Sequence, residues 1–166
     1  MQRLYIFALS AIGAMCLMAA FFAPGSGEAK PEIAVAAKKV VDADNDALLL
    51  QRDGSGQFRL TAGVNGSEVE FLVDTGADMV ALTEEEAQAL GIVLSPEDFE
   101  PMMQTASGVA NGATVKLDML EVAGVPLHDV DAVVVQGLTT NLLGQSVLRQ
   151  LGGIELKGDK MVIHPH

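Results

Sequence analysis

The sequence predicts an all-β domain with two short helices, preceded by a transmembrane helix. Three features indicate this: an uncharged apolar run near the start, a stretch rich in Pro, Gly and charged residues after it, and then short apolar runs separated by turn residues. Strands at roughly 8–12-residue spacing are typical of a closed barrel or a sandwich. The 166 residues leave room for one globular domain and a tail. We therefore divide the chain into a membrane anchor (1–23), a linker (24–46) and a globular domain (47–166).

The apolar run from Leu4 to Ala23 holds 20 residues without a charge. As a helix rising about 1.5 Å per residue, it matches the roughly 30 Å hydrocarbon core of a bilayer. We interpret it as a retained membrane anchor; the alternative is a signal peptide cleaved near residues 27–29, whose apolar core would usually be shorter. Because large domains cross membranes largely regardless of their charge, we expect a single-pass protein of the cytoplasmic membrane, with its domain on the periplasmic or extracytoplasmic side.

The charge balance excludes one class of partner. The chain carries 22 acidic and 10 basic residues, for a formal net charge of −12, and every acid follows the apolar run. Such a surface repels nucleic acid, and neither a basic stripe nor an aromatic stacking platform offsets it. The single cysteine, Cys16, lies within the apolar run, so the sequence of the domain offers neither a disulfide nor a thiolate metal site.

Alternating apolar residues and turn signals predict the strands of the domain. The expected strands span 48–50, 58–64, 69–73, 79–82, 113–122, 125–135, 154–156 and 161–163. Three of the connections have the two-residue composition of hairpin turns: Asn65-Gly66, Ala123-Gly124 and Gly158-Asp159. The stretch 106–112 is rich in small residues, and we expect a flexible segment flanked by strands there.

Two short helices complete the expected elements. The first runs to Leu90, with Thr83 and Glu86 as a capping box in which each satisfies a free backbone donor of the other, and with Gly91 as the C-cap. The second helix is expected over 145–151, opened by the residues that precede it.

Asp74 is the residue of the domain that most needs a chemical explanation. It follows the apolar run 71–73 and precedes Thr75 and Gly76 at a tight turn. A carboxylate in apolar surroundings is costly unless it is paired or protonated. The plainer alternative is a turn residue that happens to precede a glycine.

A second group of polar residues has a plainer explanation. His128, Asp129 and Asp131 lie on one expected hairpin and could suggest a metal site. One histidine and two acids in a charged hairpin are, however, usually a solvated edge. We expect neither a metal nor a cofactor.

Three motifs follow one another in order within residues 48–163. An Asp-Thr-Gly-Ala-Asp motif comes first, a glycine-bearing stretch second, and a Leu-Leu-Gly motif before the second helix third. Their residues are Asp74, Thr75, Gly76, Ala77 and Asp78; then Ser107, Gly108, Ala110, Asn111 and Gly112; then Leu142, Leu143 and Gly144. In this order the motifs resemble those of the retropepsin-like aspartic proteases of clan AA, in particular the bacterial membrane-anchored single-domain members.

The resemblance implies a closed β-barrel with Asp74 as the catalytic residue. Thr75 would brace the active-site loops of two subunits through its hydroxyl, Gly76 would permit a close backbone turn, and Ala77 and Asp78 would complete the loop. The glycine-bearing stretch takes the place of the flap that covers the substrate, and the Leu-Leu-Gly motif forms the second loop of the site.

The resemblance also implies a pair of acids. Two carboxylates about 3 Å apart cannot both be ionised and so share one proton; one then acts as the base toward water and the other as the acid toward the oxyanion. The sequence contains one such motif, so we expect the second carboxylate to be Asp74 of another copy, in a two-fold homodimer. Tethering both copies to one membrane would favour pairing.

One residue departs from the family pattern. In retroviral relatives, the residue after the glycine of the third motif is commonly an Arg that pairs with the acid at the position of Asp78. This chain has Gln145 there. We hypothesise that Arg149, one helical turn further on, substitutes for it.

These expectations add up to a membrane-anchored aspartic endopeptidase. A protein or peptide substrate would lie as an added strand, with apolar side chains beside the scissile bond. The alternative is a non-catalytic peptide-binding or dimerisation module on the same barrel, because a fold does not guarantee an activity.

Overall fold

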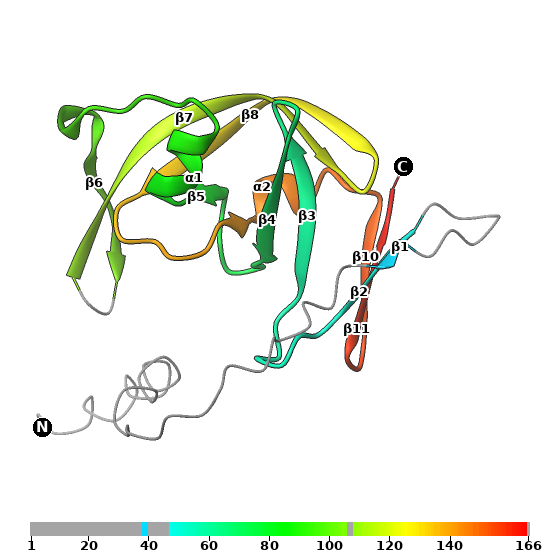
Figure 1. Cartoon of the computed structure of the whole chain (residues 1–166). Coiled ribbons are helices and arrows are strands. Elements are labelled where there is room, and N and C mark those ends of the chain that lie inside the picture. Colours follow the sequence, from blue (N-terminus) through cyan, green and yellow to red (C-terminus); the bar gives the residue numbers. More distant parts are fainter. Residues whose placement is uncertain (1–37, 40–46, 106–107, 166) are drawn as a thin grey trace, which may run out of the picture.

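A computed structural model describes residues 38–39, 47–105 and 108–165 (Figure 1). Its strands are β1 (Lys38–Lys39), β2 (Leu48–Gln51), β3 (Arg59–Val64), β4 (Ser67–Val73), β5 (Val80–Leu82), β6 (Glu100–Thr105), β7 (Gly108–Val122), β8 (Val125–Val135), β9 (Leu142–Leu143), β10 (Gly153–Lys157) and β11 (Lys160–His164). Its helices are α1 (Glu84–Ala89), the 3-10 helix η1 (Pro96–Asp98) and α2 (Gln145–Leu148). The expected anchor lies outside these residues, and no helix within them is long and apolar enough to cross a bilayer.

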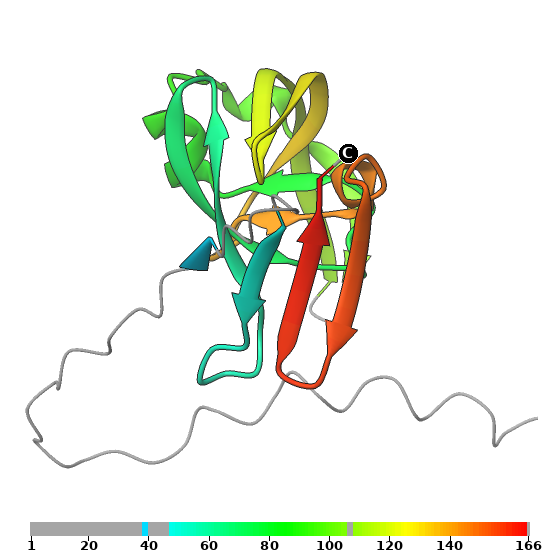
Figure 2. The same ribbon diagram turned by 90° about the vertical axis from the view of Figure 1, so that its right-hand side faces the viewer.

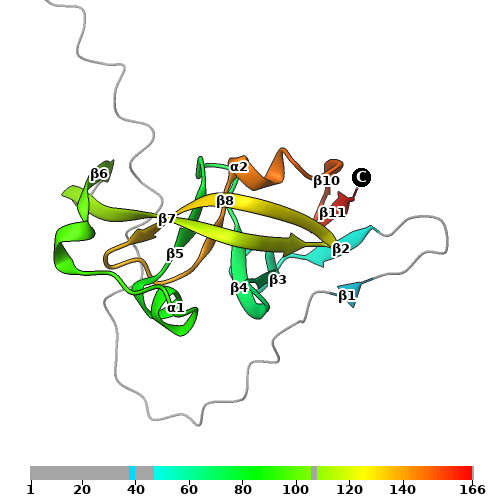
Figure 3. The same ribbon diagram turned by 90° about the horizontal axis from the view of Figure 1, so that it is seen from above.

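Six strands form a closed barrel. They follow the order β3-β4-β9-β5-β8-β7, and antiparallel pairing of β3 with β7 closes the ring. β7 and β8, the two longest strands, run together across the barrel when it is seen from above (Figure 3). β6 pairs with the outer edge of β7 and extends the sheet beyond the ring. The prediction of an all-β closed barrel with two short α-helices is therefore confirmed.

A second sheet joins the two ends of the domain in the order β1-β2-β11-β10. β2, β11 and β10 lie side by side in Figure 2. β1 pairs with the outer edge of β2, with Lys38 opposite Leu49 and Lys39 opposite Leu48. A part of the segment expected as a linker therefore adds a strand to the domain; the rest of that segment lies outside the described residues.

The core follows the two-residue period of the strands. Alternate residues of the segment that carries β3, from Phe58 to Val64, are buried, as the sequence pattern predicts. Phe71 of β4 is fully buried as well. The end of β8 is buried on both faces. Ala132 and Val134 belong to the main core, whereas Val133 and Val135 belong to a second, smaller cluster.

Two predicted hairpins are confirmed in detail. Asn65 and Gly66 have φ of 49° and 89°, and Ala123 and Gly124 have φ of 54° and 85°. Both turns thus place two successive residues in the left-handed region, which is the type I′ geometry that suits the twist of the flanking strands.

Two local predictions are wrong. Most of the stretch expected to be flexible is strand, because β7 begins at Gly108 and pairs with β6 from Thr105↔Gly108 to Glu100↔Gly112. The second helix is also shorter than expected: the sequence predicts it over 145–151, but α2 ends at Leu148. The two leucines before it form the short strand β9. The backbone of β7 is satisfied by the neighbouring strand β6, and that of β9 by β4, which is distant in sequence.

Candidate active site

Asp74 stands at the end of β4, where a parallel strand pair fixes its position. Leu72 and Val73 of β4 pair with Leu142 and Leu143 of β9. The Asp74 N–H then donates to the Leu143 carbonyl at 3.1 Å. The strand pairing therefore continues up to the acid itself, and the first and third sequence motifs are brought together.

The loop after Asp74 is tightly turned around its carboxylate. Oδ1 of Asp74 accepts a hydrogen bond from the Gly76 N–H at 2.8 Å, and the Asp74 carbonyl accepts one from the Ala77 N–H at 3.3 Å. Asp74 is half-buried, whereas Thr75 is exposed. One oxygen of the carboxylate is thus held by a backbone N–H of the loop.

The start of α2 holds the far side of this loop. The N–H groups of Gln145 and Ser146 donate to the carbonyls of Ala77 and Asp78, both at 2.8 Å, and the Gln145 side chain donates to the Thr75 carbonyl at 3.0 Å. In the sequence Gln145 is only a departure from the family pattern, and that pattern does not predict its contact with the loop.

Gly144 is required by space rather than by backbone conformation. Its φ of −95° is open to any residue. A Cβ at this position would, however, lie 2.7 Å from the Ala77 carbonyl oxygen and still closer to that of Met79. Gly76 is likewise confined, because a Cβ there would lie 3.2 Å from Oδ1 of Asp74. The two glycines of the motifs allow the loop and α2 to approach closely.

Asn141 is a residue that the motif analysis missed. Among the described residues it is the one polar residue that is buried, with 7% of its surface exposed. Its Oδ1 accepts from the Thr83 N–H at 2.9 Å, and its Nδ2 donates to the Glu70 carbonyl at 3.1 Å and to the Glu86 carboxylate at 3.2 Å. Asn141 therefore ties β4, the start of α1 and the segment before β9 together.

Asn141 also corrects the predicted capping box. Thr83 Oγ1 accepts from the Glu86 N–H at 3.0 Å, as expected, and Gly91 follows the helix in the left-handed region with φ of 76°. The reciprocal half is wrong, because Asn141 satisfies the Thr83 N–H and also binds the Glu86 carboxylate. A buried amide from a distant segment thus replaces the local contact.

The flap-like motif lies on the β6–β7 hairpin. In Figure 1 the end of β6, the start of β7 and the loop after β4 all lie toward the lower side of the barrel. Ser107 lies outside the described residues, and Gly108 and Ala110 lie in β7. Asn111 and Gly112 lie further from the tip.

Asn111 and Gly112 connect the hairpin to the barrel. The Asn111 amide donates to the Gln136 side chain at 3.1 Å, and the Asn111 carbonyl accepts from the Gln136 N–H at 3.0 Å. Gly112 is packed so closely that a Cβ would lie 2.7 Å from Val133 and 2.8 Å from the Met102 sulfur. Both residues therefore fix the base of the hairpin.

A small apolar cluster lies next to the site. Its buried members are Ala81, Val133 and Val135. Partly buried residues packed against it come from the segments on either side of the active-site loop and from the hairpin: Met79, Ala110, Leu138 and Leu142. The cluster thus packs the segment after the loop and the segment before α2 against the end of β8.

Asp78 is exposed, and Arg149 does not reach it. The Nε of Arg149 donates to the Gln145 carbonyl at 3.1 Å, within α2. The ion pairs between described residues include neither Arg149 nor Asp78. Within one chain, the hypothesis that Arg149 pairs with Asp78 is therefore wrong.

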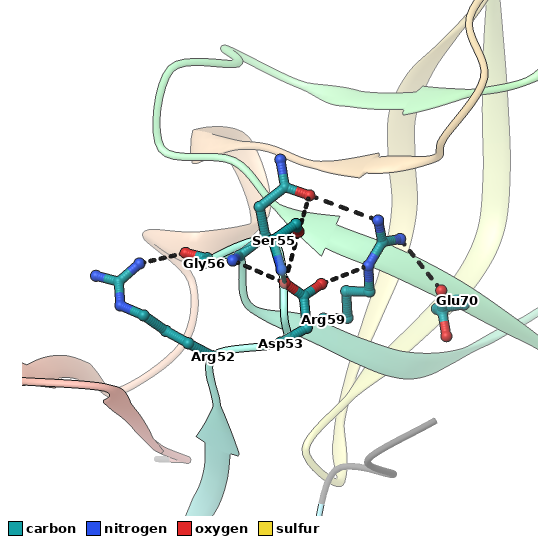
Figure 4. Close-up of polar contacts among 7 residues, drawn as sticks. Arg52, Asp53, Ser55, Gly56, Arg59 and Glu70 are labelled. Atoms are coloured by element: carbon teal, nitrogen blue, oxygen red, sulfur yellow. Dashed lines mark hydrogen bonds and ion pairs between the residues drawn. The ribbon is translucent and has the colours of Figure 1, made fainter. Parts of the chain in front are cut away.

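A polar turn supports the strand next to the site (Figure 4). Asp53 accepts hydrogen bonds from the Ser55 hydroxyl at 2.5 Å and from the Gln57 N–H at 3.0 Å, and it pairs with Arg59 at 3.0 Å. The Ser55 hydroxyl is the main reason that the pKa of Asp53 is held well below its usual range. The Phe58 carbonyl, just after this turn, accepts from the N–H of the residue before Asp74 at 2.9 Å.

Two other polar regions lie away from the loop. A cavity of about 770 Å³ between α1 and residues 137–141 has no lining residue from 74–78. Asp131 pairs with Lys116 at 2.6 Å, which raises the pKa of that lysine. Across the described residues, no group of three or more His, Cys, Asp or Glu side chains is arranged to hold a metal ion.

Comparisons with known proteins agree with this geometry. A family model described as "gag-polyprotein putative aspartyl protease" matches residues 60–150. An uncharacterised protein of Rickettsia prowazekii (strain Madrid E) is 33% identical over 118 residues, which cover 70% of this chain and 51% of the relative. An uncharacterised protein of Sinorhizobium sp., from the cobV 5′ region, is 33% identical over 116 residues, covering 69% and 50%. The chain thus spans about half the length of the curated relatives it matches.

A solved structure is also similar. The crystal structure of a retropepsin-like aspartic protease from Rickettsia conorii has a TM-score of 0.61 and 28% sequence identity, covering 72% of this chain and 90% of that chain. The family match includes the Asp74 loop, the hairpin and the Leu-Leu-Gly motif. The chain therefore belongs to the retropepsin-like aspartic protease family.

Proposed function

We propose that this chain is a membrane-anchored aspartic endopeptidase whose active site forms from Asp74 of two copies. One observation carries the proposal: each chain holds a single half-buried Asp74, fixed by the Leu143 carbonyl and the Gly76 N–H. An acid held this firmly is suited to a defined catalytic geometry. One carboxylate cannot act as both base and acid in the same step, so a second must face it.

The two acids would divide the chemistry between them. The ionised carboxylate takes a proton from a water molecule as the water oxygen attacks the peptide carbonyl carbon. The protonated carboxyl donates its proton to the carbonyl oxygen, giving a tetrahedral intermediate. Collapse of that intermediate breaks the C–N bond, and a proton passes to the leaving amine, so the products are a carboxylic acid and an amine.

The surroundings of the loop support an apolar peptide substrate. Met79, Leu138 and Leu142 are partly buried apolar residues in the segments that follow the loop and precede α2, and the end of β6 and the start of β7 lie toward the same side of the barrel as the loop (Figure 1). An extended peptide between hairpin and loop would place alternate side chains against these apolar residues.

The first experiment tests catalysis by Asp74. The full chain, purified in detergent, is incubated with a peptide mixture at pH about 4–7, alongside Asp74→Asn. Asp118→Asn is the matched control, because Asp118 is an exposed acid of β7. We expect cleavage by the wild type and the control and none by Asp74→Asn. Cleavage that survives Asp74→Asn would refute the mechanism, and peptide binding without cleavage would favour the non-catalytic alternative.

A mixing experiment tests the shared site. Wild-type chain is allowed to exchange subunits with Asp74→Asn at constant wild-type concentration. If each site needs Asp74 from both copies, an equal amount of the variant leaves about half of the wild-type activity, and a threefold excess leaves about a quarter. Activity that does not change with added variant would refute the two-copy site.

The anchor and its orientation need a separate test. Residues 4–23 are apolar enough in sequence to span a bilayer. We expect the chain to stay with membranes in alkaline carbonate and to leave them in detergent, and the domain to be open to added protease in intact spheroplasts. Release by carbonate, or a domain protected in spheroplasts, would refute the proposed location.

A further inference from the structure

Gln145 connects α2 to the active-site loop through its side chain. The Nε2 of Gln145 donates to the Thr75 carbonyl at 3.0 Å, across 70 residues of sequence. The N–H of the same residue donates to the Ala77 carbonyl at 2.8 Å. Two hydrogen bonds from one residue thus hold the carbonyls before and after Gly76. Because the loop is held at two points, it cannot rotate about a single hydrogen bond.

The Thr75 carbonyl belongs to the same peptide unit as the Gly76 N–H. That unit is planar, so fixing the direction of the oxygen also fixes the direction of the N–H. The Gly76 N–H is the donor that binds Oδ1 of Asp74 at 2.8 Å. A chain of two hydrogen bonds therefore runs from the Gln145 amide through one peptide group to the carboxylate, and bonds in such a chain polarise and strengthen one another.

We propose that Gln145 is a positioning residue for the active site: its side-chain amide orients the Thr75–Gly76 peptide and through it the Asp74 carboxylate. This inference rests on the proposed function of Asp74. An amide carries no charge and does not titrate in the acidic range, so the contact keeps its strength across the pH range in which a carboxyl pair shares a proton.

Two substitutions at this position separate positioning from mere stability. Gln145→Ala removes the donor. Gln145→Glu keeps the size of the side chain but, when ionised, offers only acceptors to the Thr75 carbonyl; when protonated, it regains an O–H donor. Gln150 provides the matched control, because it lies just past α2 and its amide donates to the Ser146 carbonyl at 2.8 Å, not to the loop.

The kinetic experiment compares kcat and KM of the full chain in detergent, at a concentration where activity per subunit no longer rises. For Gln145→Ala we expect kcat to fall about five- to tenfold, the effect of one hydrogen bond, with KM within about twofold of the wild type. For Gln145→Glu we expect a similar loss at pH 7 and recovery to within about twofold of the wild type as the pH falls through about 4, the ordinary range of a glutamate pKa. Gln150→Ala and Gln150→Glu should leave both constants unchanged.

A second measurement does not depend on activity. Amide hydrogen exchange at Gly76 and Ala77 reports how firmly the loop is held, and we expect it to be about five- to tenfold faster in Gln145→Ala but unchanged in Gln150→Ala. Unchanged exchange in Gln145→Ala, or a kcat ratio for Gln145→Glu that is flat with pH, would overturn the inference. A wild type that does not cleave would refute the proposed function, while the exchange rates would still decide the role of Gln145.

Discussion

Replacing Asn141 with alanine should destabilise the domain by about 2–4 kcal/mol. The side chain is 7% exposed and makes three hydrogen bonds, and its removal leaves the Thr83 N–H and the Glu70 carbonyl without their partner. A buried polar group without a partner costs about 1–3 kcal/mol. Two such groups give the estimate, and it stays below twice the upper value because Thr83 is only half-buried and Glu70 is exposed.

Urea unfolding followed by far-UV circular dichroism measures this change. The chain has no tryptophan, and its single tyrosine, Tyr5, lies in the apolar run, so fluorescence would not report on the domain. With a urea dependence of about 2 kcal/mol per molar, the midpoint should fall by about 1–2 M.

Asn111→Ala is the matched control, since that amide makes one side-chain hydrogen bond, to the exposed Gln136. Its effect should stay within about 1 kcal/mol. If Asn141→Ala costs no more than Asn111→Ala, then the buried amide does not hold the three elements together, and the reasoning is refuted.

Two further predictions concern space and pH. Gly144→Ala should remove activity and lower stability by about 1–3 kcal/mol or more, because the added Cβ meets the Ala77 carbonyl at 2.7 Å; Gly63→Ala, whose Cβ would have ordinary contacts, should fold and cleave as the wild type does. Thermal unfolding and peptide cleavage check both variants, and a normal Gly144→Ala would contradict the packing argument. The pKa of Asp53 is lowered chiefly by Ser55, so its contribution to stability is present above about pH 4 and is lost as the pH falls below that value. The free energy of unfolding, measured between pH 2 and 6, should therefore depend less on pH in Asp53→Asn than in the wild type. An unchanged dependence would show that Asp53 does not contribute to the loss of stability in acid.

Local features of the fold were readable from the sequence. Asn65, Gly66 and Gly124 tolerate or favour the positive φ that their turns require, and the strands beside both turns alternate in burial because one face of each is in the core. The motif around Asp74 likewise identified the loop of the candidate site. Each of these depends on residues within a few positions of one another.

The missed features depend on partners far away in sequence. In the sequence Asn141 lies in a connection before a helix, yet its side chain accepts a hydrogen bond from the Thr83 N–H, 58 residues earlier. Gly112 looked like part of a flexible loop, although its lack of a side chain allows Val133 and Met102 to pack against it. The composition of a short window records that a residue is small or polar, and it does not record which distant atom makes that property necessary.

The parallel pairing of β4 with β9 has a consequence for folding. The N–H of Asp74 is held by Leu143, 69 residues later, so the acid cannot reach its final position until the chain beyond β8 has returned to the barrel. Contacts of such long separation close large loops and form slowly compared with the hairpins that surround them. During synthesis, a chain that ends before β9 carries Asp74 without the strand pair that fixes its position. The loop of the candidate site therefore reaches its final geometry only after residues 142–143 have joined the barrel.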